Sequence, residues 1–151
     1  MKKLNKKGFT LVELLAVIVI LALLIVVVAT TALPAMNNAK ENAIVTYSKR
    51  VVDQVKGLYA NAEIAPDSEL GTLGCTKATS GLITCEYTDI KVIMGADVDT
   101  TYQIDPTAKL TISRASGKYN ISGKITGAGF AVTIETNAST GAVTYTPSEL
   151  S

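Results

Sequence analysis

The sequence has no histidine, no tryptophan and only two cysteines among its 151 residues. Histidine is the most common proton-transferring group near neutral pH and one of the two main zinc ligands, so both kinds of site are poorly supported. The chain also has no nucleophile–base pair, no phosphate-binding loop and no cofactor motif. These absences argue against an enzyme, and they predict no cofactor and no bound metal.

Positive charge is scarce beyond the first few residues. The net charge is +1, but the four lysines at positions 2, 3, 6 and 7 all precede Phe9. Beyond them, ten basic residues face thirteen acidic ones. No basic patch remains of the kind that binds nucleic acid, so we expect no specific nucleic-acid surface.

A long apolar run follows the lysines. From Leu14 to Leu33 no charged residue occurs, and a helix of that length spans the hydrocarbon core of a bilayer. The lysines before it predict a cytoplasmic N terminus. An ordinary secretory signal peptide has a shorter apolar region followed by a small-x-small cleavage site. A simple signal anchor would explain the length and the lysines, but it gives no reason for the carboxylate of Glu13.

The order of residues in this region is specific: two lysines, Gly8, and then "FTLVELLAVIVILALL" from Phe9 onward. This order resembles the class III leader and N-terminal helix of type IV pilins and pseudopilins. The resemblance covers about residues 1 to 36. It implies that prepilin peptidase cuts between Gly8 and Phe9, on the cytoplasmic side, and N-methylates Phe9. A glycine at the cut suits this, because it has no side chain to obstruct a protease.

The resemblance also gives Glu13 a role. A carboxylate within a membrane helix is costly and is usually retained when it pairs with another group. In the family this glutamate pairs with the N-terminal amine of a neighbouring subunit, here the amine of Phe9. The alternative is that Glu13 reaches the membrane interface, since it lies near the helix start.

The apolar helix departs from the family in its helix-weakening residues. Pilins commonly have a glycine and a proline within it, whereas no glycine occurs here between Gly8 and Gly57. Pro34 lies about one turn later than is typical. Because proline removes a backbone donor, we expect a kink or a loosened turn near Thr30 and Thr31.

Beyond Pro34 the pattern becomes amphipathic and then β-rich. Apolar residues recur at helical spacing as far as Ala62, which predicts one long helix over about Phe9 to Ala62. Short alternating runs separated by turn residues predict strands. The expected strands are Leu82–Tyr87, Thr101–Ile104, Lys109–Arg114, Tyr119–Ile125, Phe130–Thr136 and Ala142–Thr146. The expected fold class is therefore α+β, with an antiparallel sheet packed on the second half of the helix, which also resembles the pilin fold.

This organisation divides the chain into four segments. Residues 1–8 are the expected leader peptide, which is removed. Residues 9–36 form the hydrophobic helix that lies in the membrane or in a filament core. Residues 37–62 continue that helix with an amphipathic pattern, and residues 63–151 form a globular β-rich head.

Cys75 and Cys85 allow two interpretations. If the head lies outside the cell, they are expected to form a disulfide. Closing this short loop would contribute about 3 kcal/mol in the chain-entropy model. If the compartment is reducing, they remain free and pack as small apolar residues.

Two further patterns are weak. Asp97, Asp99 and Asp105 invite comparison with a calcium loop, but the glycine and glutamate that an EF-hand requires are missing, so solvated loop carboxylates are the better interpretation. Asn120-Ile-Ser and Asn137-Ala-Ser fit the N-glycosylation pattern, which is common by chance.

The leading functional hypothesis is a structural protein, the subunit of a type IV pilus. Such a subunit is first a single-pass protein of the cytoplasmic membrane and then part of an extracellular filament. The resemblance implies as partners further copies of the chain, prepilin peptidase, the assembly platform with its motor ATPase, and minor pilins. The alternatives are a pseudopilin of a type II secretion or DNA-uptake system, and a membrane-anchored binding module that needs neither Gly8-Phe9 nor Glu13.

Overall fold

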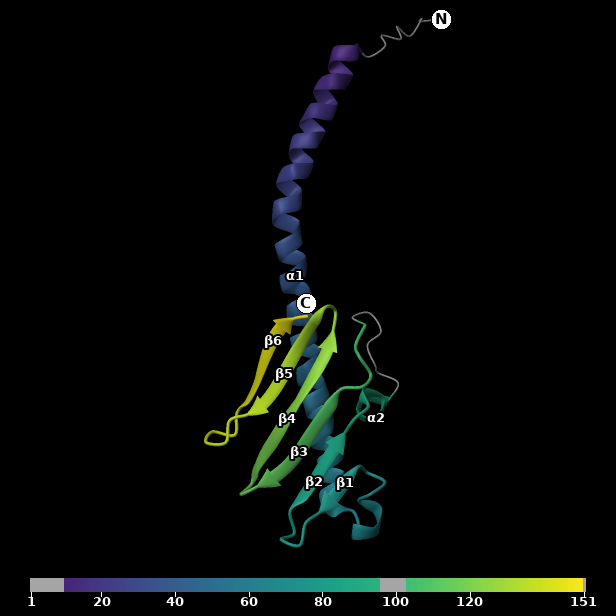
Figure 1. Cartoon of the computed structure of the whole chain (residues 1–151), viewed down its shortest axis with the longest axis vertical. Coiled ribbons are helices and arrows are strands. Elements are labelled where there is room, and N and C mark those ends of the chain that lie inside the picture. Colours follow the sequence, from purple (N-terminus) through teal and green to yellow (C-terminus); the bar gives the residue numbers. More distant parts are fainter. Residues whose placement is uncertain (1–9, 96–102, 151) are drawn as a thin grey trace, which may run out of the picture. The chain divides into compact units, whose positions relative to one another are not determined.

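The structure, a computed structural model, describes residues 10–95 and 103–150. The chain divides into two compact units, one up to Asn38 and one from Ala39 onward. The described elements follow the order α1, η1, β1, β2, α2, β3, β4, β5 and β6 (Figure 1).

The helix α1 covers Leu11–Ile64 and supplies residues to both units. Its first part is apolar on every side, whereas its second part has an apolar face and a charged face. The predicted end at Ala62 was correct to within two residues. The predicted start, Phe9, lies outside the described residues.

The second unit contains a six-stranded antiparallel sheet in which each strand pairs with its neighbours in sequence (Figure 1). Its strands are β1 (Cys75–Lys77), β2 (Ile83–Tyr87), β3 (Lys109–Ala115), β4 (Lys118–Gly127), β5 (Phe130–Thr136) and β6 (Val143–Glu149). Most neighbouring strands are joined by short hairpins, whereas the connection from β2 to β3 is longer and contains the helix α2 (Ile90–Met94). The expected α+β architecture is confirmed, as are the strands expected near the last five of these positions, β2 to β6.

The core of the second unit lies between one face of the sheet and one face of α1. In β3 and β4 the side chains alternate between the core and the outer face of the sheet. The buried ones are Leu110, Ile112, Ile121 and Ile125, and their neighbours along the strand are partly or fully exposed. The helix contributes a buried face at helical spacing: Ile44, Tyr47, Val51, Val52, Val55, Tyr59 and Ala62. This agrees with the helical spacing of apolar residues that the sequence shows as far as Ala62.

Three short elements have no counterpart among the expected ones. They are the 3₁₀ turn η1 (Asp67–Glu69), the strand β1 and the helix α2 (Ile90–Met94). The strand expected over Thr101–Ile104 is wrong in its described part, because Gln103 has a positive φ of 48° and lies in a turn. After it, the backbone of Asp105 donates to Thr126 O at 2.9 Å, and its carboxylate accepts from Thr107. The local bond between Thr107 and the Asp105 carboxylate favours a turn over a strand.

Candidate assembly site at the start of the long helix

The first half of α1 exposes a continuous apolar surface. Its large apolar side chains from Leu11 to Met36 are all at least half exposed. An 18-residue window of α1 has a mean hydropathy of 3.4, and by length and composition the helix can cross a membrane. A helix that is apolar on all sides cannot be stable in water alone, so this half requires lipid or other apolar helices around it.

The start of this helix is closed by a reciprocal cap. Thr10 lies just before the helix, and its backbone N–H and its hydroxyl donate to Oε2 of Glu13 at 2.8 and 3.0 Å. In return, the N–H of Glu13 approaches the Thr10 hydroxyl oxygen at 3.3 Å. This is a capping box, which satisfies helix N–H groups that have no partner within the helix. The pattern Thr-x-x-Glu was visible in the sequence, but its capping role was missed because Glu13 was interpreted as a partner for another subunit or as a group that reaches the membrane interface.

Within the described residues, the N–H and the hydroxyl of Thr10 both donate to the same carboxylate oxygen of Glu13, Oε2. A carboxylate has room for several further donors on its other oxygen. The capped geometry therefore leaves Oε1 able to accept from a group outside the chain. The cap and an intermolecular pair are compatible.

The other predicted site residues of this region are only partly described. Gly8 and Phe9 lie outside the described residues. Pro34 is inside α1, and the helix continues on both sides of it. One turn earlier, the Thr30 hydroxyl donates to Val27 O at 2.9 Å. The kink that proline was expected to cause stays a prediction.

Cys75 and Cys85 form a disulfide, as predicted for an exported head. They are register partners on β1 and β2, and both are buried. The bond fixes a three-residue edge strand to the sheet. The same strand is also held by hydrogen bonds from Cys75 N to Leu70 O and from Glu86 N to Gly74 O.

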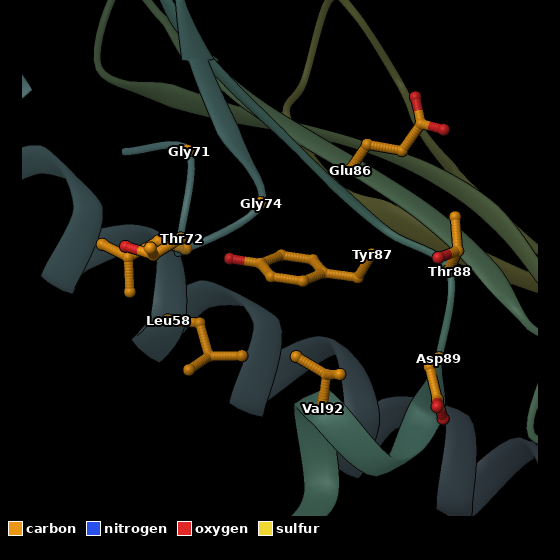
Figure 2. A pocket seen from close by; sticks show the side chains of 10 residues that line it. Leu58, Gly71, Thr72, Gly74, Glu86, Tyr87, Thr88, Asp89 and Val92 are labelled. Atoms are coloured by element: carbon orange, nitrogen blue, oxygen red, sulfur yellow. The ribbon is translucent and has the colours of Figure 1, made fainter. Parts of the chain in front are cut away.

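Beside this strand lies a hollow of about 310 Å³, and Leu58 and Leu73 are among its lining residues. Figure 2 shows the Tyr87 ring across its middle, with Leu58 on α1 and Val92 on α2 to one side. Burial raises the pKa of the Tyr87 phenol. The Glu86 carboxylate is paired with Lys109 at 2.7 Å. The floor of the hollow is apolar, and its lining shows no arrangement of nucleophile and base.

Metal ligands do not gather in the described parts of the chain, residues 10–95 and 103–150, where no three His, Cys, Asp or Glu side chains come together. Of the three aspartates considered for calcium, Asp97 and Asp99 lie outside these ranges. Asp105 is bound to Thr107 and, more weakly, to Thr126. The hydrogen bonds from Thr107 lower the pKa of the Asp105 carboxyl, which suits a turn carboxylate.

Comparison with known proteins gives one match. Residues 3–29 match the prokaryotic N-terminal methylation motif. No curated protein and no solved structure matches the chain. The matched residues contain the expected cleavage position and Glu13, together with most of the exposed apolar half of α1. The chain thus carries the methylation motif of the class III leader of type IV pilins, joined to an α+β head of pilin-like architecture.

Proposed function

We propose that the chain is a structural subunit of a type IV pilus, without enzymatic activity. The observation that carries this proposal is the exposed apolar half of α1, which begins within the methylation motif. Within the described part of the first unit, residues 10–38, nothing covers this surface, so it needs lipid before assembly and neighbouring helices after it. A filament built through such helices provides both environments in turn.

In this proposal the chain is made with residues 1–8 as a leader, and its N terminus stays in the cytoplasm. Prepilin peptidase cuts after Gly8 and methylates Phe9. The helix holds the subunit in the cytoplasmic membrane with the head outside, where the Cys75–Cys85 disulfide is stable. The assembly platform, its motor ATPase and minor pilins then act on the subunit.

Glu13 is proposed to pair with the Phe9 amine of a neighbour in the filament. In the isolated chain the carboxylate is bound by Thr10 through Oε2. An incoming amine can reach Oε1 without breaking the cap. A neighbour in the wrong register would leave a charged group without its partner in an apolar bundle, which is strongly unfavourable.

The first test is N-terminal mass analysis of the chain from membrane and surface fractions. We expect a chain that begins at Phe9 with a methylated amine. Gly8→Val should block processing, because a branched side chain obstructs the protease, whereas Lys7→Arg should not. A chain that starts at Met1, or one cut behind the apolar run as an ordinary secretory signal peptide would be, would refute the proposal.

The second test is electron microscopy of filaments sheared from the cell surface, with mass spectrometry of their main subunit. A pilin should be the main component of long filaments. A pseudopilin of a secretion or DNA-uptake system should be processed in the same way without forming them. The two tests together separate a pilin from its nearest alternative.

A further inference from the structure

Two Asn-x-Ser triplets lie at the same end of the sheet. Asn120 is in β4, and Asn137 directly follows β5. A shallow hollow of about 330 Å³ is lined by both asparagines, together with Lys118 and Tyr119. The two triplets therefore share one environment, although they differ in how their backbones are held.

The triplet of Asn137 lies in the loop between β5 and β6. All three of its residues, Asn137, Ala138 and Ser139, are exposed. The Asn137 carboxamide oxygen accepts from the N–H groups of Ser139 and Thr140 at 2.9 and 3.0 Å. Within the described residues, the carboxamide nitrogen Nδ2 has no hydrogen-bond partner.

The triplet of Asn120 is part of the sheet and of the core. Its middle residue, Ile121, is fully buried and is paired with Ile112 on β3. The backbone N–H of Ile121 also donates to the Thr136 hydroxyl at 2.8 Å. An enzyme could bind this triplet in an extended form only after pulling a central strand out of the sheet.

We propose that Asn137, and not Asn120, is an N-glycosylation site of the exported head. The donor would be an oligosaccharide joined through a diphosphate to a polyprenyl lipid, and an oligosaccharyltransferase would catalyse the transfer. Nδ2 attacks the anomeric carbon, so that a C–N bond forms and the C–O bond to the diphosphate breaks. The lipid diphosphate leaves with the electron pair, and the nitrogen loses one proton.

The residues around Asn137 fit this chemistry. Ser139 supplies the hydroxyl that the N-glycosylation pattern requires two residues after the asparagine. Glu135, two residues before it, is exposed and acidic. The corresponding residue before Asn120 is Lys118, which has the opposite charge.

The loop can also be opened at small cost. It is closed by a few hydrogen bonds, from Asn137 N to Ala142 O, from Gly141 N to Asn137 O, and from Lys118 Nζ to Ser139 O. None of these involves the core, and the following strand β6 is at the edge of the sheet. Exposed loops of this kind open locally with a free energy far below that of global unfolding.

The test is tandem mass spectrometry of the full chain from its native cells, collected from membrane and surface fractions. The peptide that contains Asn137 should carry hexose or N-acetylhexosamine units. Asn137→Gln and Ser139→Ala should both lose this mass. Ser139→Thr should keep it, and so should Ser122→Ala, which destroys only the triplet of Asn120. Ser139→Ala keeps the backbone N–H that closes the loop, so its loss of sugar cannot be assigned to a damaged turn.

Because the inference rests on export of the head, the N-terminal peptide is analysed in the same sample. An unmodified Asn137 overturns the inference. If that chain begins at methylated Phe9, the proposed pilus function is unaffected, whereas a start at Met1 refutes both. Sugar that survives in Asn137→Gln lies on a hydroxyl or on Asn120, and this result also overturns the inference.

Discussion

Tyr59 on α1 donates its phenolic hydrogen to Ile83 O on β2 at 3.0 Å, and so joins the helix directly to the sheet. Its ring is almost fully buried and meets Tyr119 edge to face, with 5.9 Å between the ring centroids. Burial raises the pKa of the Tyr59 phenol, and the nearby Glu63 carboxylate adds to the effect. The folded head therefore favours the protonated phenol.

This pKa shift predicts a loss of stability at alkaline pH. The pKa of Tyr59 is higher in the folded chain than in the unfolded chain, where it is 10.0. Such a group stabilises the fold fully at pH values below its unfolded pKa. This stabilisation is lost as the pH rises through the folded pKa. Denaturant unfolding of the full chain in detergent micelles should show a decline above about pH 10. Tyr59→Phe should be less stable at neutral pH, because it loses the bond to Ile83, but its decline above pH 10 should be shallower. Parallel declines for both proteins would contradict the prediction.

The disulfide should stabilise the head by restricting its unfolded state. Cys75 and Cys85 are separated by 10 positions, and closing such a loop contributes about 3 kcal/mol in the chain-entropy model. For a head of this size the melting temperature should fall by roughly 10 °C on reduction. Circular dichroism of the full chain, with and without reductant, measures the shift. The double variant Cys75→Ala/Cys85→Ala should melt at a similarly low temperature, and reductant should not change it. If neither reduction nor the double substitution lowers the melting temperature, the disulfide does not stabilise the head.

Two glycines should respond in opposite directions to alanine. A Cβ on Gly123, in β4, would lie 2.8 Å from Leu110 Cδ2 and 3.0 Å from Leu110 Cα, so the neighbouring strand would have to move. We expect Gly123→Ala to destabilise the head by about 1–3 kcal/mol. Gly57 lies within α1 and has nothing within 4 Å of the added atom, so Gly57→Ala should stabilise by up to about 1 kcal/mol. Thermal unfolding of both variants tests the pair, and a destabilised Gly57→Ala would show that this helix face is covered.

The cap at the start of α1 should contribute to local order. Thr10→Val removes the hydroxyl that bonds Glu13 but keeps the backbone N–H bond. Losing such a cap costs about 1 kcal/mol, which corresponds to roughly fivefold faster amide exchange in the first turn. Thr10→Ser should exchange like the original chain. Hydrogen exchange of the full chain in micelles measures this, and equal rates in Thr10→Val would show that the hydroxyl is not part of the cap.

The sequence predicted the long regular elements well and the short ones poorly. The buried helix face from Ile44 to Ala62 follows a 3.6-residue period over several turns. The strands β3 and β4 alternate between more and less buried side chains over most of their length. The strand β1 has three residues, too few for any period, and its place depends on a disulfide and a partner strand. The helix α2 reads "IKVIM", whose branched apolar residues favour a strand. The local indications of a helix were the residues at its two ends, Asp89 at the N-cap and Gly95 at the C-cap. The proposed pair between Glu13 and another subunit's Phe9 would join two chains, so the structure of one chain does not test it.

Removing the charge of Glu13 should prevent filament growth without preventing export. Glu13→Val makes the helix more apolar, so membrane insertion, processing and head folding should be retained. It also destroys the cap, and therefore Glu13→Gln is the more informative variant. The glutamine carbonyl can still accept from Thr10, but it cannot form an ion pair with an amine.

If the intermolecular pair drives assembly, Glu13→Gln and Glu13→Val should both lose nearly all surface filaments, and Thr10→Val should keep most of them. If only the cap matters, Glu13→Gln should form normal filaments while Thr10→Val and Glu13→Val do not. The measurement is a count of filaments by electron microscopy, on cells in which mass analysis shows each variant in the membrane and beginning at Phe9. Normal filament numbers in Glu13→Gln would refute the pairing. The capped carboxylate leaves Oε1 open to a second donor. We therefore expect the cap and the intermolecular pair to be present together in the assembled filament. The negative charge of Glu13 should then determine whether a subunit can be added.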